Sequence, residues 1–579
     1  MTELPASFCC AECGVYCDLF NIAVALFSIR MYLFSRRVYF LFPLAAGNGG
    51  LFYLRSLVES QAVSMVQPVK HIVIVGGGTA GWLTAGTIAA RHQGRIKTGA
   101  FSVTLVESPN IPIIGVGEGT WPTLRSTLEK MGVSETEFFR HCDAAFKQGA
   151  KFAGWTTGAG DDWYYHPLML PQGFSQVNLV PHWLKDGGGR SFCDAVCTQG
   201  ALCDDGLAPK AITTPEYQAV ANYAYHLDAG KFAPFLTKHC TEKLGVRHVL
   251  ADVSKVNIGE DGDIVSVSTE QAGDVAGDLF VDCSGARSLL LGQALGVPFK
   301  SCNDVLFCDT ALAVQVDYDS PDAAISSHTI STAQSNGWIW DIGLPTRRGT
   351  GHVYSSRHTS DEAAYDALAR YVGPAIKSLS PRKIKIHSGH RETFWKNNCV
   401  AVGLAAGFLE PLESSAIVLI ELSAKLIAEQ MPACREVMDI IAGRFNETTH
   451  YRWGRIIDFL KLHYVLTQRT DSAFWRDNVD PATVPERLQN LLKLWTYQSP
   501  WYFDEFDRLE EVFPAASYQY VLYGMGFRTE VLPEDNLHTE LMARRTFDEN
   551  LARTQTMRRQ LPKNRDLIRK IHEFGLQSI

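Results

Sequence analysis

The stretch "HIVIVGGGTAGWLTAGTIAARH", residues 71–92, combines an apolar run, a glycine-rich turn and a helix-compatible segment. The run predicts a buried strand, and Gly76, Gly78 and Gly81 allow a tight turn with close backbone approach to a ligand. The helix that follows would begin near Thr79 and Ala80, and its free amides and positive dipole end suit a pyrophosphate. The stretch therefore predicts a doubly wound, Rossmann-like α/β fold that binds a dinucleotide.

A second strand and an acidic residue follow at the expected distance. The segment "FSVTLVES" ends with Glu107, about where an acid holds the ribose hydroxyls of a bound dinucleotide. NAD and FAD both remain open at this point. Two later strand-turn units, residues 277–290 and 397–432, resemble those of two-part flavoproteins of the aromatic hydroxylase kind, and they favour FAD.

Composition limits the possible partners. The chain has 579 residues, of which 46% are hydrophobic and 20% charged, so it can form a large folded core. Its net charge of -8 offers no basic stripe for phosphates, and we expect no nucleic-acid partner. A small molecule is the default partner.

The cysteines and the N-terminal segment lack a clear functional signal. Ten scattered cysteines are expected to be reduced thiols of a cytoplasmic protein, and the cluster "CCAECGVYC" at residues 9–17 has no matching second ligand pair for a metal. The apolar runs within residues 1–64 are broken by Arg30, Arg36, Arg37 and Pro43 and are too short to span a membrane. We expect residues 1–64 to lie outside the fold, with a membrane anchor as the alternative.

The segment after residue 400 predicts an anion site. A helix is expected to start near Ser415, with Ser414 or Ser415 as N-cap, to continue through Ile417 and to end before Pro432. The amides of Ser415 and Ala416 would then be free to hold an anion. Glu413 directly precedes them, and the pattern alone does not distinguish a capping role from a carboxylate that points across the turn.

These motifs and several others resemble those of flavin-dependent tryptophan halogenases, from about residue 70 to the C-terminus. The resemblance rests on the segments "VGGGTAGW", "IGVGEGTWPTL", "AAFKQGAKFAGW", "FLEPLESSA" and a double-tryptophan motif at residues 338–340. It implies an FAD site that includes Val116, Gly117, Glu118, Gly403, Leu404 and Ile417. It implies no metal.

The resemblance also implies a reaction. In this family, reduced FAD from a separate NADH-dependent flavin reductase reacts with oxygen to give a flavin hydroperoxide, which oxidises chloride or bromide to hypohalous acid. A lysine, here Lys147, presents this oxidant to an electron-rich arene, and Glu413 matches the acidic partner. Ser415 and Ala416 would hold the halide, although the family more commonly has a Thr-Gly pair, which leaves the halide preference open.

The pattern around Lys147 allows a second interpretation. The segment "FFRHCDAAFKQGAKF" is amphipathic, and on spacing alone Lys147 reads as an exposed helix lysine with Lys151 one turn later. The motif position favours Lys147 over Lys151 as a desolvated, positioned amine.

The substrate signals depart from those of a free-tryptophan enzyme. His166 matches a pocket histidine, but Leu168 replaces a neighbouring aromatic residue. Near the C-terminus, Tyr502 and Phe503 replace a tyrosine pair, and a stacking tryptophan is replaced around Pro514. Indole, a substituted indole, a phenol or a tryptophan-containing peptide fits at least as well as the free amino acid.

The double-tryptophan motif reads as a strand. Trp338 and Trp340 alternate onto one face, and the resemblance implies that they lie by the flavin and the tunnel; spacing alone does not separate a tunnel wall from core packing. Gly343 stands where the family usually has proline, and Pro345 follows two residues later. The backbone after Ile342 is expected to be freer than usual.

The expected architecture is an FAD-binding halogenase core with an inserted sheet, residues 66–440, and a helical substrate-side region, residues 441–579. A homodimer is expected as one possible assembly, and no membrane partner. The rival functions are a single-component FAD aromatic monooxygenase and a catalytically inactive FAD-binding protein.

Overall fold

The computed structural model describes residues 67–111, 117–186, 189–502, 511–530 and 538–578. Met65–Ile579 group as one compact unit, and residues 1–64 lie outside the described residues. The predicted division near residue 440 stays a prediction, and helix α12 (Arg435–Val465) runs through that position. No helix within the described ranges is both long and apolar enough to cross a membrane.

A six-stranded sheet carries the predicted nucleotide-binding layer. Its central strand β1 (His71–Val75) pairs in parallel with β2 (Ser102–Glu107) and β12 (Leu279–Asp282), so both predicted neighbours are confirmed. The remaining strands are β8 (Arg247–Leu250), β21 (Cys399–Ala401) and β20 (Trp395–Lys396), in the order β20-β21-β12-β1-β2-β8. Because the carboxyl ends of parallel strands meet at one edge, the loops after β1, β2, β12 and β21 lie together.

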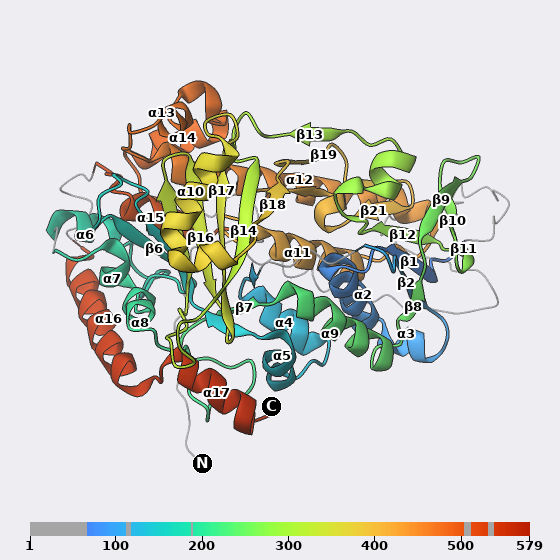
Figure 1. Ribbon diagram of the computed structural model, residues 1–579, viewed down its shortest axis with the longest axis horizontal. Coiled ribbons are helices and arrows are strands. Elements are labelled where there is room, and N and C mark those ends of the chain that lie inside the picture. Colours follow the sequence, from blue (N-terminus) through green and yellow to red (C-terminus); the bar gives the residue numbers. More distant parts are fainter. Residues whose placement is uncertain (1–66, 112–116, 187–188, 503–510, 531–537, 579) are drawn as a thin grey trace, which may run out of the picture. The chain divides into compact units, whose positions relative to one another are not determined.

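A seven-stranded sheet is the predicted insertion. Its order is β18-β14-β17-β16-β15-β5-β6, where the strands are β18 (Arg382–Lys385), β14 (Thr310–Asp317), β17 (Arg347–Tyr354), β16 (Gly337–Gly343), β15 (Thr329–Gln334), β5 (Gly149–Ala153) and β6 (Trp163–Pro167). Strand β15 pairs in parallel with β5, which brings residues 149–167 beside the double-tryptophan hairpin. The seven-stranded sheet lies beside the nucleotide-binding layer (Figure 1).

A small third sheet links these two layers. It has the order β3-β7-β4, formed by β3 (Glu118–Gly119), β7 (Ala224–Leu227) and β4 (Ala145–Lys147), all antiparallel. Lys147 is the last residue of β4. Two further three-stranded sheets contain β9 (Val253–Ile258), β10 (Ile264–Thr269) and β11 (Gly273–Ala276), and β13 (Phe299–Ser301), β19 (Gly389–Arg391) and β22 (Gly407–Phe408).

Helices cover these sheets. Beside the nucleotide-binding layer, α2 packs on both α9 and α11 (Figure 1). The helices of this part are α2 (Thr79–Arg91), α3 (Gln93–Lys97), α4 (Thr123–Lys130), α5 (Glu135–Cys142), α9 (Ala229–Glu242) and α11 (Ser415–Glu429). The others are α6 (Val180–Asp186), α7 (Phe192–Val196), α8 (Gln199–Asp204), α10 (Asp361–Val372), α13 (Ala473–Asn478), α14 (Glu486–Trp495), α15 (Ala515–Gly524), α16 (Glu540–Gln560) and α17 (Asn564–Phe574). The C-terminal region is thus helical, as expected.

A buried carboxyl joins α4 to α11 and makes stability depend on pH. Thr127 donates to Glu421 at 2.7 Å and Thr123 donates at 3.2 Å, while burial raises the pKa of Glu421 to about 8. The protonated form is therefore favoured in the folded chain, so this contribution is complete below pH 4.5 and is lost as the pH rises toward 8.

Glu421→Gln should flatten that pH dependence, because the amide keeps its hydrogen bonds without ionising. We expect the stability difference between the variant and the parent to change by up to about 1.4 kcal/mol per pH unit between pH 5 and 8. Thermal unfolding of both proteins across this range measures it. If the stabilities of the variant and the parent changed with pH in parallel, Glu421 would be ionised in the folded chain.

Candidate active site

The predicted dinucleotide turn has the backbone that a pyrophosphate requires. Gly76 has φ +119°, and a Cβ on Gly81 would lie 1.8 Å from the carbonyl oxygen of Gly76. Helix α2 begins at Thr79, and its N-cap Gly78 makes no side-chain capping bond, so the first amides, including that of Ala80, are free for an anion. A Cβ on Gly78 would contact no protein atom within 4 Å. The turn fits the phosphates of FAD.

Gly81→Ala should therefore damage flavin binding, since the methyl group cannot enter without moving the turn. We expect the Kd for FAD to rise at least about tenfold, equivalent to roughly 1.4 kcal/mol, in a fluorescence titration. Gly94→Ala is the matched control, because a Cβ there meets nothing within 4 Å. Unchanged affinity in a folded Gly81→Ala protein would contradict the assignment of this turn.

Glu107 lies directly over the same turn. A Cβ on Gly77 would meet the Glu107 carboxylate, and Glu107 Oε2 is 2.8 Å from His248 Nε2. The carboxylate is thus held at the carboxyl end of β2, next to the predicted pyrophosphate position. This placement suits a ribose hydroxyl.

Residues predicted for FAD and for halide line one small cavity at the start of α11. Gly403, Leu404, Ser415 and Ala416 all border it, together with Phe408 and Trp453. Gly403 has φ +69° and Leu404 is 44% exposed, so this turn is open on one side. Ser414 is the N-cap of α11, and its side chain makes no capping bond to the helix.

The remaining predicted FAD residues lie on separate elements. Gly117 has φ +99° and precedes the two-residue strand β3, in which burial raises the pKa of Glu118 to about 7. Ile417 is buried in α11, where it belongs to the hydrophobic core. Val116 falls outside the described residues.

Lys147 is buried at the end of a strand, so the helical interpretation of this segment is wrong. Its side chain is 4% exposed, and Nζ donates to Ser414 Oγ at 3.1 Å and to the carbonyl of Thr120 at 3.2 Å. A Cβ on Gly119 would approach Nζ to 3.2 Å, which shows how closely β3 covers the amine. Burial lowers the pKa of Lys147 to about 8, although Glu413 counteracts this effect.

Glu413 is a buried carboxylate held by two imidazoles. Its Oε1 lies 2.9 Å from His166 Nδ1 and 3.1 Å from His463 Nε2. Burial alone would raise the pKa of Glu413, but the attraction of His166 and hydrogen bonds from both histidines lower it to about 2. The backbone carbonyl of Glu413 accepts a bond from Trp121 Nε1 at 2.9 Å. The carboxylate therefore points across the turn.

Each histidine is oriented by a hydroxyl group on its other nitrogen. His166 Nε2 is 2.9 Å from Ser517 Oγ in α15, and His463 Nδ1 is 2.6 Å from Tyr164 Oη in β6. The sequence pattern indicated only His166. His463 lies in the last turn of the long helix α12 with no motif around it, and only the fold brings it to Glu413.

Aromatic rings surround this carboxylate. Phe459 and Phe513 stack with centroids 3.8 Å apart, and Phe513 also packs edge-on against Trp121 at 4.9 Å. The ring centroid of His166 lies 5.5 Å from that of Phe459. Phe513, rather than the Pro514 that follows it, thus stands beside His166. Leu168 directly follows β6, which carries His166.

The C-terminal pair predicted for the substrate is only partly described. Tyr502 is 41% exposed and its ring lies 6.4 Å from that of Phe174. Phe503 falls outside the described residues.

The two tryptophans occupy β16 as expected. Trp338 is 1% exposed and Trp340 is 6% exposed, with ring centroids 6.4 Å apart. A Cβ on Gly343 would come within 3.2 Å of Tyr318 Oη and 3.1 Å of Ile325 Cγ2, so these two side chains fill the space beside this residue.

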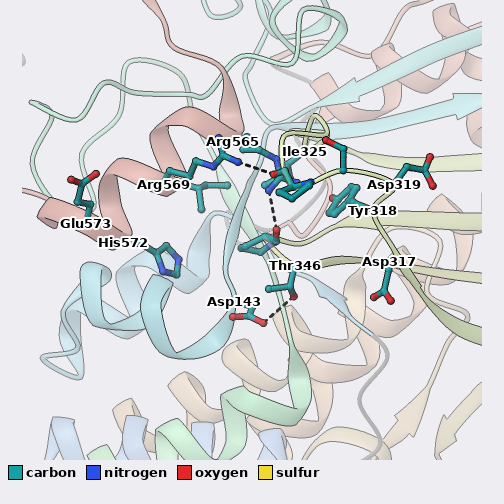
Figure 2. A pocket seen from close by; sticks show the side chains of 14 residues that line it. Asp143, Asp317, Tyr318, Asp319, Ile325, Thr346, Arg565, Arg569, His572 and Glu573 are labelled. Carbon is teal, nitrogen blue, oxygen red and sulfur yellow. Dashed lines mark hydrogen bonds between the residues drawn. The ribbon is translucent and has the colours of Figure 1, made fainter.

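A cavity of about 790 Å³ lies away from these groups, between α17 and the turn after β16 (Figure 2). Arg565 donates to the carbonyl of Pro345 at 3.0 Å, and Arg569 is paired with Asp322 at 2.6 Å. The cavity contains neither Lys147 nor Glu413.

Comparisons with known proteins agree with this geometry. The tryptophan halogenase family model matches residues 71–538. Tryptophan 6-halogenase SttH of Streptomyces toxytricini is 36% identical over 476 residues, covering 79% of this chain and 89% of that protein. The crystal structure of a tryptophan halogenase from Shewanella frigidimarina matches with TM-score 0.86 and 48% identity, over 88% of this chain and 99% of that one. BrvH, a flavin-dependent halogenase from Brevundimonas sp. BAL3, matches with TM-score 0.77 and 34% identity, over 87% and 99%.

These relatives share almost the whole described fold, from the glycine turn after β1 to the C-terminal helices. The chain therefore belongs to the tryptophan halogenase family and is a flavin-dependent halogenase that uses reduced FAD and a halide.

Proposed function

We propose that this enzyme halogenates a neutral, electron-rich arene, an indole ring, with hypohalous acid that Lys147 delivers. One observation carries the proposal: Lys147 and Glu413 are both buried, Lys147 bonds to Ser414, the residue next to Glu413, and aromatic rings pack around His166, the partner of Glu413. Such a site keeps an unselective oxidant from water and releases it at one point.

We propose that the halide and the flavin bind next to this site. The free amides of Ser415 and Ala416 at the N-terminus of α11 would hold chloride or bromide, and the turns at Gly76–Gly81 and Gly403 would hold FAD. When bound and reduced, FAD supplies the oxygen chemistry that converts halide into hypohalous acid. Because bromide is oxidised more easily, we propose bromide as the preferred halide of this Ser-Ala site.

Lys147 would hold the oxidant by hydrogen bonding to its oxygen. The ammonium already donates to Ser414 and Thr120, so one of its three protons can reach a further acceptor. That bond would polarise the halogen toward the arene. At neutral pH, a pKa of about 8 leaves most of the amine protonated.

Glu413 would stabilise the cationic arene that forms after halogen transfer and then accept its ring proton. A halogenated arenium ion is a strong acid, so a carboxylate with a pKa of about 2 is a sufficient base. His166 and His463 hold the carboxylate ionised and in place.

The aromatic enclosure supports an indole without a charged amino-acid group. Arg455 lies on the helix of Phe459 and Glu511 lies two residues before Phe513, and these two charges pair with each other at 3.2 Å. A free amino acid would bring two charges that need partners of their own.

We expect kcat/KM for indole to exceed that for free tryptophan at least about tenfold in a reconstituted assay with bromide. Product formation by liquid chromatography with mass spectrometry measures both. A tenfold preference for free tryptophan would contradict the proposed substrate class.

Three further features belong to the proposal. The reduced FAD would come from a separate NADH-dependent flavin reductase, the enzyme would work in the cytoplasm, and it would form a homodimer.

A further inference from the structure

Three buried thiols lie on or at the end of helices that pack against β6, the strand that carries His166. Cys193 is in α7, Cys197 is the residue that ends this helix, and Cys203 is in α8; all three are free and at most 5% exposed. Both helices pack against β6, the strand of His166. No role in halogenation, as described above, uses them.

Cys193 and Cys197 form a hydrogen-bonded pair. They are one helical turn apart, and the Cys197 N–H donates to the Cys193 carbonyl at 2.8 Å. Their thiols also hydrogen-bond to each other. Cys203 is not part of this pair and lies in the next helix, α8.

The pair lies one side chain away from the active site. Tyr520 in α15 hydrogen-bonds to Cys197, and its ring centroid is 6.5 Å from that of His166. Ser517, one turn earlier in α15, is the hydroxyl partner of His166. Tyr520 thus lies between the imidazole of His166 and the Cys197 thiol.

The two thiols differ in reactivity. Burial opposes ionisation of Cys197, but hydrogen bonds from Cys193, from the Gln199 N–H at 3.5 Å and from Tyr520 lower its pKa. The Cys193 pKa is raised, because its thiol donates to Cys197 and is buried. Cys197 is therefore the nucleophile of the pair and Cys193 the resolving thiol.

We propose that Cys193 and Cys197 trap hypohalous acid that leaves Lys147 without meeting an arene, and that they become a disulfide. This inference rests on the proposed function. The Cys197 sulfur attacks the halogen, which gives a sulfenyl halide and water. The Cys193 sulfur then displaces halide, which releases a proton and closes the S–S bond. Two thiols lose two electrons, and the electrophilic halogen returns as halide.

The distance between the two cysteines allows a disulfide between them to be reduced again. Residues one turn apart in a helix have Cβ atoms about 5–6 Å apart, whereas a relaxed disulfide needs about 3.5–4.5 Å. A disulfide here would be strained and easily reduced by cellular thiols. We expect dithiothreitol to restore both thiols in folded enzyme.

The experiment uses the whole enzyme with flavin reductase, NADH, FAD, bromide and catalase, without arene. Trypsin releases residues 191–210, "SFCDAVCTQGALCDDGLAPK", which contain all three thiols. We expect this peptide to lose two hydrogens before the more exposed Cys434 is oxidised. Hypobromous acid added from outside should reverse that order, because it meets Cys434 first.

Variants identify the pair. Cys193→Ser should abolish the two-hydrogen loss, and Cys203→Ser, the matched control in the same peptide, should keep it. Oxidation of Cys434 first during turnover, equal disulfide without bromide, or a disulfide that needs Cys203 would overturn the proposal.

A soluble β-diketone, brominated in parallel, reports whether turnover makes the oxidant. If the β-diketone stays unmodified, the proposed function fails. The reaction of the enzyme with added hypobromous acid then tests the Cys193–Cys197 pair without turnover. A disulfide that persists in Cys203→Ser then supports the trap, and oxygen addition to Cys193 or Cys197 contradicts it.

Discussion

Lys147→Met should lower the rate of halogenated-arene formation about a thousandfold, while FAD binding and oxidant formation stay within about twofold of the parent. The substitution keeps the length of the side chain in a fully packed position but removes the donor that faces Ser414 and Thr120. Arene product is measured by mass spectrometry, and free oxidant by bromination of a β-diketone. The β-diketone, added in excess, should then capture the oxidant that leaves the enzyme before it meets the arene.

Lys151→Met is the matched control, because Lys151 is the other lysine of the same motif. It is paired with Asp204 at 2.9 Å and lies over the Trp163 ring at 4.3 Å, away from Glu413. We expect at most about a threefold change. If Lys151→Met abolished activity and Lys147→Met did not, the assignment of the two lysines would be wrong.

The parent enzyme should also lose activity as the pH rises through about 8. Burial lowers the pKa of Lys147 to about 8, so the ammonium that donates a hydrogen bond is present below this pH and absent above it. This fall of the rate above pH 8 should be absent in Lys147→Met, because the variant has no amine at this position. A rate that instead rises through pH 8 would show that the neutral amine is the acting form.

Glu413→Gln should lower arene halogenation about a hundredfold or more, with oxidant formation unchanged. The amide keeps the shape and one acceptor for His166, but it carries no charge for the cationic arene and cannot take its proton. Glu421→Gln, which removes another buried carboxyl of the same segment, is the control and should leave the rate within about threefold. A Glu413→Gln rate equal to that of the parent would exclude a charge role for Glu413.

Local signals predicted the parts of the fold that local sequence determines. The strand, glycine turn and helix of residues 71–91 and the helix that starts at Ser415 are confirmed because periodicity, glycines and caps are properties of a few neighbouring residues. The same argument misread the segment around Lys147: its apolar positions also fit a helix, but pairing with β7, some 80 residues later, makes it a strand.

The partners of Glu413 could not be predicted in this way. His463 and Ser517 lie 50 and 104 residues beyond it in the chain, and neither stands in a motif. The sequence pattern placed the replaced stacking residue around Pro514, whereas Phe513 is the residue that lies beside His166. Only the packing of α12 and α15 against β6 brings these side chains together.

The departure from the family motif at Gly343 also has a long-range explanation. Tyr318 and Ile325 occupy the space that a side chain at this position would need, and both lie outside the motif. Glycine at position 343 thus fits the space that Tyr318 and Ile325 leave.

The most direct test of the central claim is the product formed from indole with and without bromide, using reduced FAD from a separate reductase. We expect monobrominated indole with bromide and no hydroxylated indole in its absence. Hydroxyindole formed at the same rate without halide would contradict it in favour of a monooxygenase, and no product of either kind from FAD-loaded protein would leave only a binding role.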